Sequence, residues 1–269
     1  MRTFLRRLML WGSGALLLSV GAAKALGLQR VRPNARPATD PQRALDALLE
    51  RIVVADSVNY DAFELADIEA IAAAYASTGP NSEPDAYTSD DARLAYYLNA
   101  YNTLVLFAVK KFGVQASVHE VRGLIEPKAG FGFFWGAFHR LDGSYINLYD
   151  LEHTIIRGFG DARIHTAINC ASRSCPSLRG RAFTAENLNH ELDEASAHFV
   201  SGERHVRRSG QGWELSAIFD WYRNDFGGDA GIRAFIRTHC QRENCADLDE
   251  DPLSFRPYDW SLNAPPTDP

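Results

Sequence analysis

The sequence predicts an α+β fold: a single helix-rich domain with a buried central helix and a small antiparallel sheet. Three observations support this class. The segment 89–113 is apolar almost all round, which is typical of a helix buried on every side. Several other segments repeat apolar residues at helical spacing. The alternating segments are few and short, and turn residues such as Asp142-Gly143 interrupt them.

The helices begin and end at residues with capping chemistry. Asp40 can cap the first helix, and Pro41 suits its first position. Ser89 or Asp90 can cap the central helix, which ends at Gly113. In chain order, the expected helices cover residues 41–54, 61–77, 89–113, 148–160, 184–200, 217–227 and 229–240.

The strands are expected in two hairpins and one isolated segment. AFHRLDGSYINL (137–148) predicts a hairpin that leads into the helix capped by Asn147, and HVRRSGQGWELS (205–216) predicts a second hairpin. RIHTAINC (163–170) alternates in polarity like a strand. FRPYDWSLN (255–263) is expected to close the chain as an extended segment.

The N-terminus predicts export. Arginines at the start precede an apolar run from Leu8 to Ala23, and Ala23-Lys24-Ala25 has the small residues of a cleavage site. This order is typical of a secretory signal peptide, so a periplasmic or extracellular location is expected. An uncleaved membrane anchor is the alternative. The expected organisation is a signal peptide at 1–25, a flexible tether at 26–40, one domain at 41–263 and a loose tail at 264–269.

The net charge of the chain indicates which classes of binding partner to expect. The whole chain has 28 basic and 34 acidic residues, and loss of residues 1–25 removes four basic residues, leaving 24 against 34. A net charge of −10 (24 minus 34) disfavours nucleic acid, which is bound through a basic surface. The expected partner is therefore an envelope ligand or protein, with no nucleic acid and, unless the signal is retained, no membrane span.

Sequence motifs predict no cofactor and no metal. The sequence has neither a P-loop, nor a Rossmann glycine pattern, nor a G-x-S-x-G elbow. Its cysteines form two C-x4-C pairs, whose spacing is wider than in zinc knuckles. In an exported chain these pairs are expected as disulfides, joining Cys170 to Cys175 and Cys240 to Cys245.

Five blocks in order carry a family resemblance: YLNAYNTLVLFAV, INLYDLEHTIIR, DARIHTAINCASRSCPSLR, LSAIFDWYRNDFG and PYDWSLN. They resemble the domain of unknown function 547 family over about residues 60–263. The resemblance implies an exported protein, since such domains are found in exported bacterial proteins and in some plant proteins. It implies no settled activity. The pair Cys240 and Cys245 does not belong to the family pattern.

The stretch RIHTAINCASRSCPSLRG (163–180) leaves several chemical interpretations open. Cys170 or Cys175 could be a thiolate nucleophile activated by His165 or His153 and oriented by an asparagine or Glu152. Alternatively, a disulfide braces the turn, and the predicted export favours this interpretation. A redox-active pair ranks third, because the spacing is not C-x-x-C.

Further polar residues predict a pocket. Asn99 and Asn102 lie three apart on the central helix, where they either bond neighbouring backbone or orient a ligand. Glu152 borders the buried face of its helix and is expected to pair with Arg157 or Arg163. The candidate ligand-binding residues are Asn99, Asn102, Asn169 and Arg163, and the candidate catalytic residues are Cys170, Cys175, His165, His153 and Glu152.

Two hypotheses of function follow, and whether the protein is an enzyme stays open. The first is an exported, envelope-associated domain that binds a ligand or partner in a polar His/Asn/Glu pocket beside a cysteine-stapled turn. The alternative is a cysteine-dependent amide hydrolase or acyl transferase that acts on an envelope substrate through the same residues.

Overall fold

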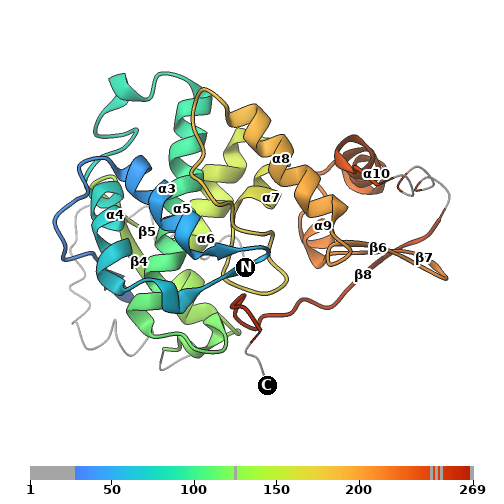
Figure 1. Ribbon diagram of the computed structural model, residues 1–269, viewed down its shortest axis with the longest axis horizontal. Helices are drawn as coiled ribbons and strands as arrows, with labels where there is room; N and C mark the ends of the chain where they lie inside the picture. The colour runs from blue at the N-terminus through green and yellow to red at the C-terminus, as the bar shows by residue number, and fades with distance from the viewer. Residues whose placement is uncertain (1–27, 124–125, 243–244, 246–247, 249–250, 267–269) are drawn as a thin grey trace, which may run out of the picture.

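A computed structural model describes residues 28–123, 126–242, 245, 248 and 251–266, and its secondary structure is of the expected α+β class (Figure 1). The helices are α3 (Pro41–Ile52), α4 (Leu65–Ser77), α5 (Asp90–Phe112), α6 (Leu148–Asp150), α7 (Ile164–Ala167), α8 (Leu188–Ser201), α9 (Ala217–Trp221) and α10 (Gly228–His239). The strands are β1 (Gln29–Val31), β2 (Val53–Val54), β3 (Ser57–Val58), β4 (Ala137–Leu141), β5 (Ser144–Asn147), β6 (Val206–Ser209), β7 (Gly212–Leu215) and β8 (Leu253–Phe255).

Helix α5 is the predicted buried central helix. Every residue from 94 to 109 is buried, so the helix is enclosed on all sides. The Ser89 hydroxyl accepts a hydrogen bond from the backbone N–H of Ala92, and Gly113 ends the helix in the left-handed conformation, with φ of +66°. Helix α3 also begins as predicted, because the Asp40 carboxylate accepts from the N–H of Arg43.

In the part of the chain that the structure describes, three small sheets replace the single antiparallel sheet of the prediction. Their strand orders are β1-β4-β5, β2-β3 and β6-β7-β8. Both predicted hairpins are present, β4-β5 with Asp142 and Gly143 at its turn and β6-β7 further along the chain. Each of these hairpins also pairs in parallel with a distant strand, β1 on β4 and β8 on β7. Parallel partners come from remote segments, which local patterning does not reveal.

Strand β1 lies in the segment 26–40 that the sequence predicts as a flexible tether, of which residues 28–40 are described. Gln29–Val31 pairs with Ala137–His139. The Val31 side chain is 5% exposed and belongs to the main hydrophobic core. The N–H of Ala38 also donates to the carbonyl oxygen of Ala70 on α4. This segment is therefore fixed to the domain by backbone pairing and by an apolar side chain.

The stretch 163–170 is not the strand that its alternation predicted. It begins with the helical turn α7 and is extended only from Ile168. The Asp161 carboxylate accepts from the N–H of Arg163, and the Thr166 hydroxyl donates to the Arg163 carbonyl oxygen, so local side chains favour a turn. From 164 to 169 both the polar and the apolar residues are buried, and the alternation therefore did not mark an inner and an outer face.

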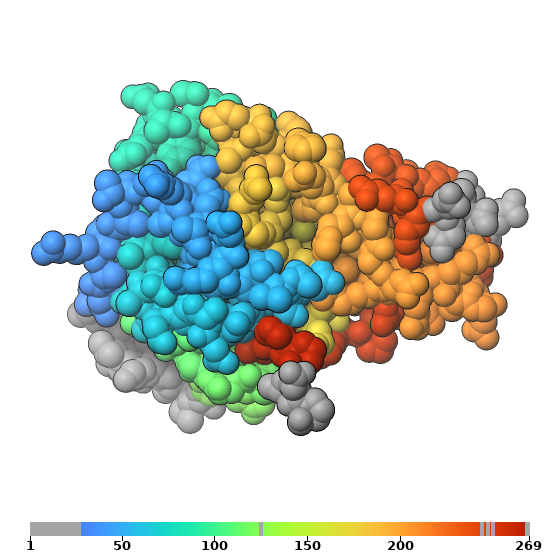
Figure 2. Space-filling view, in the orientation of Figure 1, coloured from blue at the N-terminus to red at the C-terminus, as the bar shows by residue number. Residues whose placement is uncertain are grey.

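The C-terminal segment is extended, as predicted, and joins distant parts of the fold. The N–H of Leu262 donates to the Ala116 carbonyl oxygen, and the N–H of Asn263 donates to that of Ala171. Figure 2 shows this segment, in red, at the lower edge of the visible face, next to the blue and green surfaces of the N-terminal half. The described core consists of a main cluster around α5 and a second cluster around β7, α9 and α10.

The predicted signal peptide lies outside the described residues, as do residues 267–269 of the predicted loose tail. Within the part of the chain that the structure describes, no helix is both long and apolar enough to cross a membrane.

Candidate functional site

A pocket of about 350 Å³ lies where α5, α7, α9 and the C-terminal segment meet. Eight of its 17 lining residues are aromatic. Trp221, which is 49% exposed, stacks with Trp260 at 5.9 Å between ring centroids. On another wall, the Trp135 ring lies 4.7 Å from that of Tyr149. We call this cavity the aromatic pocket.

An irregular helix positions the acidic side of the aromatic pocket. Asn147 caps it as predicted, accepting from the N–H of Asp150 at 2.7 Å. The stretch 148–160 is not one regular helix, however. It consists of α6, the π-helical turn η5 (Leu151–Ile155) and the 3-10 turn η6 (Ile156–Phe159). Single π-helical turns frequently occur at functional sites, and this one carries both Glu152 and His153.

Glu152 is a buried carboxylate held by tyrosines. Its side chain accepts hydrogen bonds from the hydroxyl of Tyr222 and, at 3.3 Å, from that of Tyr101. Burial raises its pKa, and the tyrosine bonds and the charge of Arg157 act in the opposite direction. The predicted ion pair is therefore wrong in detail: neutral hydroxyls bond the carboxylate, and Arg157 acts on it only through its charge.

His165 lines the same pocket and is bonded to an aspartate. Its Nε2 atom lies 2.8 Å from Oδ2 of Asp225, and its ring stacks on Tyr222 at 3.8 Å. Burial lowers its pKa to about 4, despite the opposing effect of Asp225. Because a carboxylate accepts, Nε2 carries the proton and Nδ1 is left as an unprotonated acceptor. Nδ1 is buried and has no hydrogen-bond partner among the described residues.

Arg157 completes this group of charges. Its guanidinium forms a two-pronged ion pair with Asp225, with both nitrogen–oxygen distances at 2.7 Å. The hydrogen bond from Arg157 is the main reason that the pKa of Asp225 is lowered to about 2. Asp225 is thus an ionised acceptor for two groups, and it fixes the ring of His165.

His153 is also held in one protonation form. Its ring stacks on Tyr149 at 3.9 Å, and its Nδ1 atom lies 3.2 Å from the Tyr149 carbonyl oxygen. A carbonyl only accepts, so Nδ1 carries the proton and Nε2 is the basic atom. Burial and the charge of Arg157 lower the pKa of His153 to about 4, which keeps the ring neutral.

The first cysteine pair lies in the wall of the aromatic pocket. Cys170 and Cys175 form the expected disulfide, with Cα atoms 6.1 Å apart, and Cys240 and Cys245 form the second. The hydroxyl of Tyr258 lies 3.1 Å from both sulfurs of the first pair. Among the described contacts, neither of these sulfurs is hydrogen-bonded to His165 or His153.

The asparagines lie behind the pocket and not in its lining. Asn99 exchanges two hydrogen bonds with the backbone of Phe183, both at 2.8 Å. Asn102 accepts from the N–H of Asn169 at 2.9 Å and donates to the Ala167 carbonyl oxygen at 3.1 Å. Asn169 in turn bonds backbone atoms of its own turn. These contacts favour the structural alternative, in which the amides fix loops against α5.

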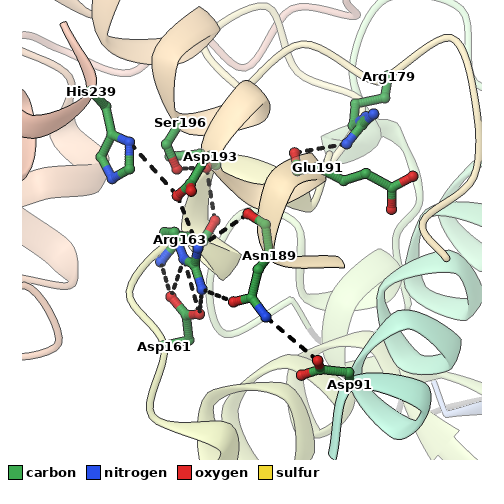
Figure 3. Close-up of polar contacts among 10 residues, drawn as sticks. Asp91, Asp161, Arg163, Arg179, Asn189, Glu191, Asp193, Ser196 and His239 are labelled. Carbon is green, nitrogen blue, oxygen red and sulfur yellow. Dashed lines mark hydrogen bonds and ion pairs between the residues drawn. The ribbon is translucent and has the colours of Figure 1, made fainter. Parts of the chain in front are cut away.

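Arg163 lies away from the pocket lining, in a polar cluster beside α8 (Figure 3). Its guanidinium contacts Asp161 at 2.6 Å and Asp193 at 2.8 Å, and it donates to both the side chain and the backbone of Asn189. These bonds tie the turn before α7 to α8. No group of three or more His, Cys, Asp or Glu side chains suited to a metal ion occurs in the described part of the chain.

Sequence reasoning therefore found five lining residues, Glu152, His153, His165, Cys170 and Cys175, and missed others. The missed contributors are Tyr101, Tyr222, Asp225 and Tyr258. Tyr222 and Asp225 lie in the block LSAIFDWYRNDFG, and Tyr258 lies in PYDWSLN. Membership in these family blocks was therefore the only feature of the sequence that could have marked these three residues as functional.

The fold and site define an α+β domain with an aromatic pocket next to a disulfide. Residues 85–200 match the family model described as protein of unknown function, DUF547. This match supports a DUF547 family domain within the chain, as the resemblance predicted. The matched range includes Glu152, His165 and the first cysteine pair, while Asp225 lies beyond it. No curated protein and no solved structure matches the chain.

Proposed function

We propose that the chain binds a small organic molecule in the aromatic pocket, and that this ligand has a ring and several hydroxyl or amino groups. Aromatic walls with a few buried polar groups are typical of small-molecule sites. The exposed ring of Trp221 and the stacked rings of Tyr149 and Trp260 offer flat faces for such a ligand.

One observation carries the choice of ligand: side chains that line the pocket carry acceptor atoms. They are the carboxylate of Glu152 and the Nε2 atom of His153, and the Nδ1 atom of His165 is a third acceptor that is buried. The tautomers follow from the carboxylate and carbonyl partners of the two rings. A ligand that brings O–H or N–H donors complements the carboxylate of Glu152 and the Nε2 atom of His153, whereas an anion would face the acidic Glu152. Sugars and aromatic amines share this chemistry.

We also place this activity outside the cytoplasm. The predicted signal peptide supports export, and two cysteine pairs at disulfide distance are compatible with an oxidising compartment.

A cysteine-dependent hydrolase is not proposed, because among the described contacts neither sulfur of the pocket is hydrogen-bonded to a histidine. An acid or base role for Glu152 and His165 on the bound ligand is compatible with their perturbed pKa values.

Tryptophan fluorescence tests the proposal, since three tryptophans line the pocket. We would titrate the full chain with neutral mono- and disaccharides, with aromatic amines, and with aromatic carboxylates as the mismatched class. We expect saturable quenching by one of the first two classes, and about tenfold or greater weakening in Glu152→Gln and Trp221→Ala.

Glu191→Gln is the matched control. Glu191 is likewise a buried carboxylate on a helix, but it bonds Thr184 and does not line the pocket. Its replacement should leave the affinity unchanged. Equal binding of the carboxylate class, or equal loss of affinity in Glu191→Gln, would count against the proposal.

A further inference from the structure

We propose that Cys170–Cys175 is an exchangeable disulfide that reacts with a small thiol entering the aromatic pocket. In this reaction Cys170 is the sulfur attacked and Cys175 the sulfur that leaves. The inference stands on the surroundings of the two sulfurs, and it does not depend on the ring-bearing ligand proposed above.

Accessibility distinguishes the two sulfurs. Both cysteines line the pocket, but Cys175 is only 2% exposed, whereas Cys170 is partly exposed. A thiolate attacks along the line of the S–S bond, so it must reach one sulfur from outside. Because Cys170 is the more exposed of the two residues, its sulfur is the one that an incoming thiolate attacks.

One hydrogen-bond donor distinguishes them further. The backbone N–H of Cys170 donates to the Cys175 sulfur at 2.9 Å, while the hydroxyl of Tyr258 lies 3.1 Å from each of the two sulfurs. Burial raises the pKa of Tyr258, so its hydroxyl stays protonated and able to donate. Donors facing a sulfur stabilise the thiolate that forms when the S–S bond breaks, and a better leaving thiolate speeds exchange.

The turn that carries the pair is held by other bonds. The N–H of Cys175 donates to the Ser172 carbonyl oxygen, and the N–H of Arg173 donates to that of Ser261. Ala171, between the cysteines, has φ of +64° and bonds the Asn169 side chain and the backbone of Asn263. These bonds keep the two sulfurs near each other after reduction, which allows the disulfide to re-form.

The exchange balances with two equivalents of thiol. The first thiolate forms a bond to Cys170 Sγ, the S–S bond breaks, and its electron pair goes to Cys175 Sγ as a thiolate. The second thiolate attacks the thiol-derived sulfur of the mixed disulfide and releases the Cys170 thiolate. Two thiols are oxidised to one disulfide, and the protein disulfide gains their two electrons and, in water, two protons.

The second disulfide provides a control within the same chain. Cys240–Cys245 has the same sequence separation, and Cys245 is 3% exposed, close to the value for Cys175. Its Cys240 sulfur, however, lies 3.8 Å from the carbonyl oxygen of Arg242, an acceptor that does not stabilise a thiolate. Among the described contacts, the two pairs therefore differ in the groups that face their sulfurs.

The test follows reduction of both pairs in the folded full chain. Dithiothreitol is added without oxygen, samples are quenched with an alkylating agent, and peptide mass spectrometry reports each cysteine. We expect Cys170 and Cys175 to be labelled at least about tenfold faster than Cys240 and Cys245. With the monothiol 2-mercaptoethanol and an acid quench, the trapped adduct should be on Cys170.

Tyr258→Phe checks the role of the donor. Loss of one hydrogen bond should slow reduction of the pocket pair about two- to tenfold. The rate of the Cys240–Cys245 pair should not change, which also shows that the variant is folded. Equal rates for both pairs, an adduct on Cys175, or an unchanged rate in Tyr258→Phe would each overturn the proposal. Saccharide or amine binding is measured separately, so failure of either proposal is distinguishable from failure of the other.

Discussion

The Nε2 atom of His165 lies 2.8 Å from the Oδ2 atom of Asp225, and that carboxylate also binds the guanidinium of Arg157. The bond joins α7 to the turn after α9, 60 residues later in the chain. It fixes both the tautomer and the plane of a buried imidazole. The second ring nitrogen is thereby left as a buried acceptor with no hydrogen-bond partner among the described residues.

Asp225→Asn should destabilise the fold by roughly 1–3 kcal/mol, because Arg157 loses its ionised partner and His165 loses its strongest acceptor. Chemical denaturation measures this. Asp220→Asn is the control, since Asp220 pairs with Arg223 at an exposed surface, and it should change stability by less than about 0.5 kcal/mol. Equal effects of the two changes would contradict the role of Asp225.

Asn99→Leu and Asn102→Leu should each destabilise by roughly 1–3 kcal/mol despite the gain in apolar surface. Each replacement leaves one backbone N–H and one carbonyl group without a partner in the interior. Urea denaturation gives the free energy of unfolding for each variant.

Thr103→Val on the same helix is the matched control for the two asparagines. The Thr103 hydroxyl is buried and has no hydrogen-bond partner among the described residues, so its removal should be neutral or slightly stabilising. If both asparagine variants behaved like Thr103→Val, their amides would not be fixing the loops of Phe183 and Asn169.

Local signals explain which parts of the fold were predictable. Ser89 and Gly113 bound α5 through their own capping chemistry, and Asp142-Gly143 turns the first hairpin. These features depend on neighbours in sequence. Strand β1 forms instead by pairing with β4, more than 100 residues later, and the sequence near Val31 contains no signal for that partner. The strand prediction for 163–170 was wrong because a polar residue there, His165, is as buried as its apolar neighbours.

The site was predictable only to the extent that its residues have distinctive chemistry. Histidines, cysteines and Glu152 draw attention in any sequence, and they do line the pocket. Asp225 and Tyr222 resemble ordinary surface and core residues until the fold brings them to His165 and Glu152. From the sequence, the amides of Asn99 and Asn102 could equally have bonded a ligand or the backbone. The structure places the backbone of Phe183 and of Asn169 within hydrogen-bond distance of these amides.

Stability should fall as the pH is lowered from about 7 to 5. The folded-state pKa of His165 is lowered to about 4 from an ordinary value of 6.5. Between these values the unfolded chain binds a proton that the folded chain does not, so acid favours unfolding. The same sign holds for His139, whose pKa burial also lowers to about 4.

His165→Gln should flatten this dependence. Each buried neutral histidine contributes a slope of up to about 1.4 kcal/mol per pH unit, and the variant loses one such contribution. Unfolding free energies of both proteins at pH 7, 6 and 5 measure the difference. A variant that parallels the native chain across this range would show that His165 is protonated in the folded state.

Glu152→Gln should have the opposite pH signature. Burial raises the pKa of Glu152 above its ordinary value of 4.5. Above pH 4.5 the folded chain therefore holds a proton longer than the unfolded chain, and the stability that this group provides in acid is lost as the pH rises through its folded pKa. Glutamine does not titrate, so the stability of the variant relative to the native chain should increase from pH 4.5 upward, by at most about 1.4 kcal/mol per pH unit. Denaturation of both proteins at pH 4.5, 6 and 7.5 gives this difference. A relative stability that decreases with pH would mean that Tyr101, Tyr222 and Arg157 together outweigh burial, and that the carboxylate at the pocket is already ionised in acid.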